Sequence, residues 1–271
     1  MCVSSFRRLA YLAVGPASPR TLGVTNHPPA TSRTRIPMPE PKLLTHKHDG
    51  VLTLTLNRPN KLNAIDNELA SALLEALDAG TSDTTVRAVR LLGSGRAFCA
   101  GRDVSAAPTE KDLALVQGVA KAIVRSSKPV VAAVHGWTVG AGLEWMLDAD
   151  IVICAESTRF KLPEASIGVF VTGGLSATLP AMVGLARAKA LVMLGEEISA
   201  RQAFDWGMVY KIVADKDLDA ASWQAAATLA ALAPPVAAQF KRVFNLLGLE
   251  AFDRAINEED KAHRAIGSSD A

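Results

Sequence analysis

Short apolar runs alternate with stretches of helical periodicity between residues 51 and 155, and this alternation limits the folds open to the chain. Strands separated by helices favour parallel pairing with right-handed crossovers. The sequence therefore predicts an α/β fold. The predicted strands are residues 51–56, 86–92, 129–134 and 151–155, and the predicted helices are residues 66–80, residues 110–126 and a short helix from about residue 141.

Capping residues set the limits of the first predicted helix. Asp66 has a side chain that suits the N-cap, and Gly80 is a residue type that often ends a helix. Apolar residues recur at helical spacing between these two positions. We therefore expect this helix to begin after Asp66 and to stop at Gly80.

The sequence becomes mostly helical after about residue 185. Such a region cannot bury all of its Leu, Ala and Trp side chains alone, so we expect it to pack on the core or on a neighbouring subunit. The predicted organisation is a leader at 1–40, an α/β core at 41–195 and a helical C-terminal region at 196–271. The helices predicted after about residue 185 span residues 186–194, 199–206, 218–232, 236–247 and 249–266, with a short strand at 209–213.

The composition is that of an ordinary globular protein. The chain has 271 residues, of which 49% are hydrophobic, enough to bury a substantial core. Charged residues or glycine interrupt every long apolar run, so no membrane span is predicted. Cys2, Cys99 and Cys154 are too few and too scattered for a disulfide framework or a zinc site, which favours a reducing compartment.

The first 39 residues differ from the rest in charge. They carry five arginines and no acidic residue, a pattern typical of a mitochondrial transit peptide. The alternative, which we favour, is that translation starts at Met38. The corresponding locations are the mitochondrial matrix and the cytoplasm, and the cytoplasm is the prediction. Beyond the leader, 24 basic and 27 acidic residues leave a net charge of −3, which argues against a nucleic-acid partner.

Two glutamates stand among apolar residues, Glu144 in a glycine-rich turn and Glu164 after Pro163. Burial disfavours the charged form of a carboxyl group, and a second carboxylate nearby disfavours it further. A facing pair can therefore hold one proton donor and one acceptor near neutral pH. Taken singly, Glu144 could instead complement a helix dipole, and Glu164 could be a solvated turn residue.

Two small-residue segments, 96–103 and 136–144, indicate close approach of the backbone to a ligand. Gly140, Ala141 and Gly142 leave the N-terminus of a helix open, with free N–H groups and the positive end of its dipole exposed. Such a turn can receive an anion or an oxyanion. It matches neither the dinucleotide fingerprint nor a P-loop.

Several ordered motifs together resemble the crotonase superfamily, the enoyl-CoA hydratase/isomerase family. The resemblance runs from residue 52 to near the C-terminus. The motifs are residues 56–64 (Leu-Asn-Arg-Pro-Asn-Lys-Leu-Asn-Ala), 97–103 (Ala-Phe-Cys-Ala-Gly-Arg-Asp), 128–136 (Lys-Pro-Val-Val-Ala-Ala-Val-His-Gly), 140–144 (Gly-Ala-Gly-Leu-Glu), 160–168 (Phe-Lys-Leu-Pro-Glu-Ala-Ser-Ile-Gly) and 198–203 (Ile-Ser-Ala-Arg-Gln-Ala).

The resemblance implies a crotonase-like spiral of ββα units with a helical C-terminal trimerisation region, assembled as a homotrimer or a dimer of trimers. It implies an oxyanion hole made by the backbone N–H groups of Arg102 and Ala141, with Glu144 and Glu164 as the catalytic pair. It further implies an acyl pocket at Trp137, Leu143 and Phe170. The residues that it assigns to substrate and CoA binding are Arg58, Lys61, Ala64, Ala100, Asp103, Gly140 and Gly173.

Ordinary structural alternatives remain for several of these residues. Arg58 and Lys61 could be a solvated pair, and Asp103 could merely cap the next segment of the chain. Aromatic and aliphatic residues such as Trp137 and Leu143 are often plain core. A nucleophilic role is not expected for Cys99, and His135 is interpreted as structural.

The predicted function is that of an enoyl-CoA hydratase in fatty acid metabolism, with an acyl-CoA thioester as substrate. No metal or cofactor is expected beyond the coenzyme A of the substrate. Alternatives are an enoyl-CoA delta-isomerase, another crotonase-type acyl-CoA lyase or hydrolase, or a non-catalytic RNA-binding relative. The sequence departs from the family pattern at Ala141, which replaces a glycine and is tolerated if its φ is negative. It also departs at the loop 171–175, which in the family helps to shape the water site, and this second departure weakens the prediction of hydration itself. The short end at 267–271 raises the expectation of a truncated C-terminus.

Overall fold

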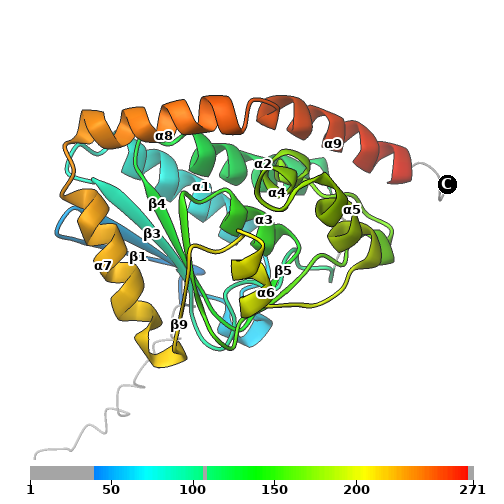
Figure 1. The fold of residues 1–271 in the computed structure, drawn as a ribbon, viewed down its shortest axis with the longest axis horizontal. Coiled ribbons are helices and arrows are strands. Elements are labelled where there is room, and N and C mark those ends of the chain that lie inside the picture. Colours follow the sequence, from blue (N-terminus) through cyan, green and yellow to red (C-terminus); the bar gives the residue numbers. More distant parts are fainter. Residues whose placement is uncertain (1–39, 106–108, 268–271) are drawn as a thin grey trace, which may run out of the picture. The chain divides into compact units, whose positions relative to one another are not determined.

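The computed structural model describes residues 40–105 and 109–267 of the chain (Figure 1). The predicted leader lies outside these residues, apart from Glu40. Residues 40–271 group into one compact unit, so the boundary predicted at residue 195 falls inside it. Within the described ranges, no helix combines the length and the apolar character needed to cross a membrane.

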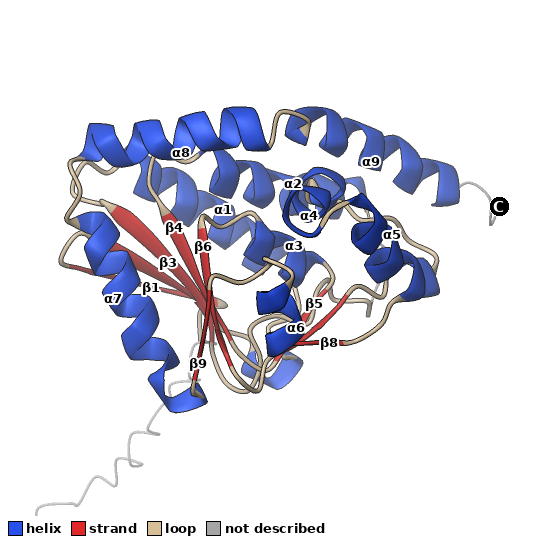
Figure 2. Cartoon of the chain, viewed as in Figure 1, coloured by secondary structure: helices blue, strands red, loops and turns tan. Residues whose placement is uncertain are grey.

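A six-stranded sheet lies at the centre of the fold and confirms the predicted α/β class (Figure 2). Its order is β1-β2-β3-β4-β6-β9, and every pair is parallel except the first. The strand β1 was not predicted, because its sequence Leu-Leu-Thr-His-Lys-His is exposed at the sheet edge and shows no apolar pattern. The strands are β1 (Leu43–His48), β2 (Val51–Leu56), β3 (Ala88–Gly93), β4 (Val130–Val134), β6 (Ile151–Ala155) and β9 (Lys211–Val213).

Helices cover both faces of this sheet. The helix α7 (Leu218–Ala230) packs on one face, and α1 (Asn67–Ser82) packs on the other together with α2 (Glu110–Arg125). In β4, Val131 and Ala133 belong to the cluster under α7, whereas their neighbours belong to the larger core. Coverage on both sides explains why this strand is an unbroken apolar run.

A second sheet of very short strands contains the segments that follow β4 and β6. It contains β5 (Trp137–Val139), β7 (Arg159–Lys161) and β8 (Ile198–Ser199). The chain passes from β4 through β5 into the helix α3 (Ala141–Leu147), and from β6 through β7 into the 3-10 helix η2 (Glu164–Ile167). This repeat of two strands and a helix is the expected ββα spiral. Strands of two or three residues are too short to give a pattern in the sequence.

The first helix confirms one predicted limit and corrects the other. The side chain of Asp66 accepts a hydrogen bond from the backbone N–H of Leu69, as an N-cap does. The helix does not stop at Gly80 but continues to Ser82. Gly80 lies within it because a Cβ atom there would come 2.6 Å from Cδ2 of Leu52, so the glycine lets the helix approach the sheet.

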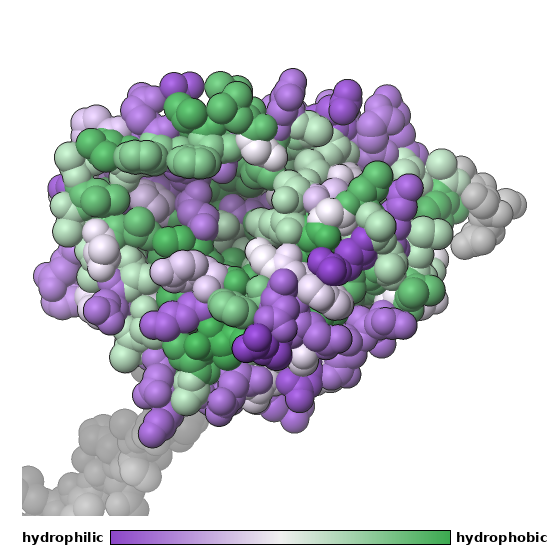
Figure 3. All heavy atoms as spheres, viewed as in Figure 1, coloured by the Kyte–Doolittle hydropathy of each residue, from purple (hydrophilic) through white to green (hydrophobic). Residues whose placement is uncertain are grey.

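The C-terminal region packs partly on the core. The helix α9 (Phe252–Gly267) lies against α4 (Leu175–Val183) (Figure 1), and its Phe252 and Ile256 join the main core. In contrast, α8 (Pro234–Gly248) leaves Phe240, Phe244 and Leu247 at least 63% exposed, within an apolar surface visible in Figure 3.

The helix α4 was not predicted, since Pro180 lies inside it. The remaining elements are η1 (Pro59–Lys61), α5 (Leu185–Leu194), α6 (Ala200–Asp205) and η3 (Asp215–Asp217).

Candidate active site

A cavity of about 460 Å³ opens between the loop at residues 100–105, the N-terminus of α3, η2 with the loop after it, and α9. Both predicted catalytic glutamates line it. So do Ala100, Asp103 and Gly140 from the predicted substrate site. This cavity is therefore the candidate active site.

The two predicted oxyanion donors lie on adjacent segments at the cavity wall. Arg102 forms a parallel bridge with Ile65, in which the N–H of Ile65 bonds to Gly101 and the N–H of Asp103 bonds to Ile65. In such a bridge the N–H of the central residue, Arg102, points away from the bridged strand. Ala141 is the first residue of α3, and an N–H at that position has no acceptor within the helix. Both residues line the cavity, as an oxyanion hole requires.

Gly140 allows this turn to approach a carboxylate closely. Its φ of +52° and ψ of −130° are strained for any residue with a side chain. A Cβ atom there would come 2.7 Å from Oε1 of Glu164. Glycine is therefore required both by the backbone conformation and by the neighbouring acid.

Glu144 is 1% exposed and lies in the first turn of α3. Its Oε1 accepts a hydrogen bond from the backbone N–H of Thr172 at 3.1 Å, and its Oε2 accepts one from the Thr172 hydroxyl at 3.3 Å. Burial raises the pKa of Glu144 to about 8, with further contributions from the charges of Glu164 and Glu259. Dipole compensation alone does not account for a carboxyl group in this position.

Glu164 is 7% exposed, so its interpretation as a solvated turn residue is wrong. It opens η2 after Pro163. Burial raises its pKa to about 7, and its Oε2 has no hydrogen-bond partner among the described residues. Two buried carboxyl groups with raised pKa values thus line one cavity, and they can exchange protons with a bound molecule near neutral pH.

A third carboxylate, which was not predicted from the sequence, holds the loop that follows η2 in place. Glu259 of α9 accepts hydrogen bonds from the backbone N–H groups of Gly174 and Ser176, each at 2.8 Å, and from the Ser176 hydroxyl. It is completely buried. In the sequence it stands in the charged run at residues 258–261, where only its spacing from Phe252 and Ile256 marks it as inward-facing.

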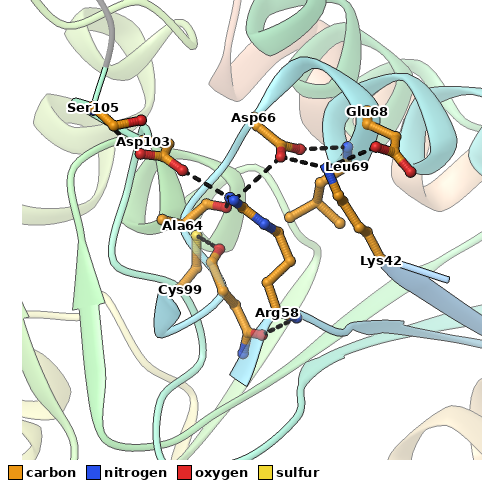
Figure 4. Close-up of polar contacts among 10 residues, drawn as sticks. Lys42, Arg58, Ala64, Asp66, Glu68, Leu69, Cys99, Asp103 and Ser105 are labelled. Carbon is orange, nitrogen blue, oxygen red and sulfur yellow. Dashed lines mark hydrogen bonds and ion pairs between the residues drawn. The ribbon is translucent and has the colours of Figure 1, made fainter. Parts of the chain in front are cut away.

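Arg58 is engaged in an internal ionic network (Figure 4). Its Nη2 lies 3.0 Å from Oδ2 of Asp103 and 3.2 Å from Oδ2 of Asp66, and its Nη1 donates to the carbonyl oxygen of Ala64. Asp103 also accepts a hydrogen bond from the backbone N–H of Ser105. Both terminal nitrogens of the Arg58 guanidinium group already interact with these partners. This arrangement argues against the predicted contact of Arg58 with CoA phosphates. Asp103 orients the loop, and this agrees with its interpretation as a structural residue.

The other residues assigned to CoA are placed differently from one another. Lys61 is exposed at the end of η1, and Ala64 contributes its carbonyl oxygen to Arg58. Gly173 lies against Glu144 instead, because a Cβ atom there would come 2.7 Å from Oε2 of Glu144. None of the three lines the cavity, so their contact with CoA stays a prediction.

The predicted acyl pocket is only partly correct. Phe170 lines the cavity, whereas Trp137 is 39% exposed outside it and Leu143 is fully buried in the core. Neighbouring residues on a helix point about 100° apart, so Leu143 turns away from the face shared by Ala141 and Glu144. The apolar walls that we did not predict are Val104, Val139, Ile167 and Val169, and His263 of α9 also lines the cavity.

Cys99 and His135 have structural surroundings, in line with their interpretation. The Cys99 thiol donates a hydrogen bond to the carbonyl oxygen of Asn63, and burial raises its pKa to about 12. A thiol of that kind does not form a thiolate near neutral pH. The His135 Nε2 lies 2.9 Å from the carbonyl oxygen of Gly95, outside the cavity.

Comparison with known proteins agrees with this geometry. Residues 46–270 match the family described as enoyl-CoA hydratase/isomerase. A 1,2-epoxyphenylacetyl-CoA isomerase of Escherichia coli is 35% identical over 84% of this chain and 90% of its own length. A 2,3-dehydroadipyl-CoA hydratase of the same bacterium is 36% identical over 62% of this chain and 68% of its own. The crystal structure of an enoyl-CoA hydratase from Mycobacterium avium subsp. paratuberculosis superposes with a TM-score of 0.80 at 29% identity, over 84% of this chain and 95% of that one.

Proposed function

Because the chain belongs to the enoyl-CoA hydratase/isomerase family of the crotonase superfamily, we propose that it is a 2-enoyl-CoA hydratase. The reaction adds water across the 2,3 double bond of an acyl-CoA thioester. The observation that carries this proposal is the pair of buried carboxyl groups, Glu144 and Glu164, lining one cavity beside two backbone donors.

The backbone donors would polarise the thioester. With its carbonyl oxygen between the N–H groups of Arg102 and Ala141, C3 of the enoyl group becomes electrophilic and the developing enolate is stabilised. Removing one such donor typically costs about 3 to 4 kcal/mol of activation free energy. Neither donor is a side chain, so the carbonyl site survives substitutions of the glutamates.

The glutamates would manage the protons. One carboxylate takes a proton from a water molecule held between the pair, and the protonated partner delivers a proton to C2. Each such step contributes roughly 10² to 10⁴ in rate. Raised pKa values of both groups support this division, because one of them can stay protonated while the other is ionised near neutral pH.

An enoyl-CoA isomerase is the second candidate, and one observation favours it. Glu144 is held by two hydrogen bonds from Thr172, whereas Oε2 of Glu164 has no partner in the described part of the chain. A single free carboxylate can move a proton between two carbons without a bound water. A relative at 35% identity is named as an isomerase of another CoA ester, 1,2-epoxyphenylacetyl-CoA.

The mass of the product separates the two candidates. Purified protein is mixed with short, long, branched and aromatic 2-enoyl-CoA and 3-enoyl-CoA esters, and the products are identified by mass spectrometry. Hydration adds the mass of water, whereas isomerisation moves the double bond at constant mass. Turnover of none of these esters would refute both candidates.

A non-catalytic RNA-binding role is the alternative of a different class. The net charge of −3 beyond residue 39 argues against it. Salt-sensitive RNA binding by a chain lacking residues 1–37, together with no turnover of any acyl-CoA ester, would favour this alternative over the hydratase.

A further inference from the structure

His263 brings a polar side chain into the cavity from the last helix. It lies in α9, one turn after Glu259, and it lines the same cavity as Glu144 and Glu164. Glu259 holds α9 to the loop at Gly174 and Ser176, while Phe252 and Ile256 are buried in the core. The position of His263 is therefore fixed at two points of its own helix.

Outside the glutamate pair, His263 differs from the other polar side chains of the cavity in having no partner among the described residues. Thr172 donates to Glu144, and Asp103 and Arg102 form ion pairs with Arg58 and Asp112. Ser105, which also lines the cavity, interacts with Asp103, and the remaining walls formed by described residues outside the glutamate pair are backbone and apolar side chains. A cavity of this type uses its few polar groups to orient a ligand.

The two ring nitrogens of His263 are not equivalent. Nδ1 is enclosed by protein and makes no hydrogen bond within residues 40–105 and 109–267, and Nε2 has no hydrogen bond to those residues either. Burying an N–H group without a partner is more costly than burying a bare acceptor. In the uncharged ring the proton therefore favours Nε2, which leaves Nε2 as the N–H donor of this side chain.

We propose that His263 is a specificity-determining residue whose Nε2–H recognises an oxygen acceptor on the acyl group, beyond the reacting double bond. The inference rests on the proposed function for the placement of the thioester at Arg102 and Ala141. The preferred substrates are then acyl-CoA esters that carry a carbonyl or hydroxyl oxygen on the acyl chain. The apolar walls, including Ile167, Val169 and Phe170, enclose the hydrocarbon part.

The test compares substrates that differ only in this oxygen. The first pair is hex-2-enoyl-CoA and 5-oxohex-2-enoyl-CoA, and the second is hept-2-enoyl-CoA and 6-oxohept-2-enoyl-CoA. We expect the wild type to prefer the oxo ester in at least one pair. His263→Phe should lower kcat/KM for that ester by about 5- to 100-fold and leave its unsubstituted partner within about twofold. His263→Gln, which keeps an N–H donor, should retain most of the preference.

Controls separate recognition from folding and from the proposed reaction. His46→Phe changes an exposed residue of β1 outside the cavity and should leave both esters unaffected. Calorimetric binding of the saturated hexanoyl and 5-oxohexanoyl esters, and of the heptanoyl and 6-oxoheptanoyl esters, reads the preference without turnover. If the preference appears there and His263→Phe abolishes it, the inference stands even where no water is added.

Three results would overturn the inference. The first is a wild type that shows no preference for an oxo ester in either pair. The second is an equal loss for both members of a pair in His263→Phe, which would indicate a structural or acid/base role. The third is an unchanged preference in His263→Phe, which would assign recognition of the oxygen to another group.

Discussion

Glu144 and Glu259 come from α3 and α9, yet they accept hydrogen bonds from backbone N–H groups only two residues apart, those of Thr172 and Gly174. The loop that carries these N–H groups is tightly packed. A Cβ atom added at Gly173 would clash with Glu144, and one added at Gly174 would clash with Phe252. The helix α9 therefore helps to set the position of Glu144. This relationship links α9 to the candidate active site.

Glu259→Gln should weaken both stability and activity. The amide group would turn an N–H toward the N–H and O–H donors of Gly174 and Ser176, leaving buried groups unpaired at a cost of about 1–3 kcal/mol. The shifted loop would displace Thr172 from Glu144 and lower kcat. Urea unfolding and steady-state kinetics measure the two effects. Glu258→Gln, at the exposed neighbouring position, is the matched control, and equal effects of both variants would contradict this role.

Gly140→Ala should impair catalysis by displacing Glu164. The added Cβ atom would come 2.7 Å from its Oε1, and the backbone conformation would be strained by about 1–3 kcal/mol. Gly184→Ala is the control, because Gly184 also has a positive φ but no atom within 4 Å of an added Cβ. We expect both variants to lose stability in thermal unfolding. Only Gly140→Ala should lower kcat, by tenfold or more, and a similar kcat loss in Gly184→Ala would refute the contact argument.

The exposed apolar face of α8 should be covered by another copy of the chain. Phe240 and Phe244 are 63% and 70% exposed, and their rings stack at 6.4 Å between centroids. Leaving such a surface in water is unfavourable by about 25 cal/mol per Å² of apolar area. Light scattering should show a trimer or a multiple of it, and Phe240→Glu with Phe244→Glu should shift the population toward monomer. A wild type that stays monomeric at micromolar concentration would refute this expectation.

The sequence predicted the parts of the fold that have a strong local signal. The apolar run at residues 129–134 predicted β4 because that strand is buried on both faces. It did not predict β1, whose side chains are mostly exposed and which is ordered by pairing with β2. Local patterns report burial along one element, whereas pairing at an edge depends on the rest of the sheet.

In the candidate site, too, the sequence predicted only the residues that have a strong local signal. Glu144 and Glu164 stood out because each is a lone acid among apolar residues, and both line the cavity. Glu259 and His263 did not stand out, since neighbouring charges hide them in the sequence and only the packing of α9 brings them to the site. Which residues from distant elements converge on a cavity is a property of tertiary structure, so no spacing rule could supply it.

The free energy of unfolding should decrease between about pH 5 and pH 8, in part because of the glutamate pair. Burial raises the pKa values of Glu144 and Glu164 to about 8 and about 7, above the unfolded value of 4.5. The stability that each protonated group contributes is fully present below its unfolded pKa, and it is lost as the pH rises through its folded pKa. Glu164→Gln removes one such group, so urea unfolding should show a decrease smaller by about 2 kcal/mol. An unchanged pH dependence would contradict the raised pKa of Glu164.

Glu144→Gln and Glu164→Gln test the proposed chemistry directly. Glutamine keeps the size of the side chain but cannot transfer the proton, so each variant should lower hydration by about two to four orders of magnitude. Binding of a saturated acyl-CoA should persist, because the donors of Arg102 and Ala141 belong to the backbone. Kinetics and calorimetry measure the two quantities. If only Glu164→Gln abolishes turnover and the double bond moves without a gain of water, the isomerase is the correct assignment. If neither variant changes turnover, the two glutamates are not the catalytic pair.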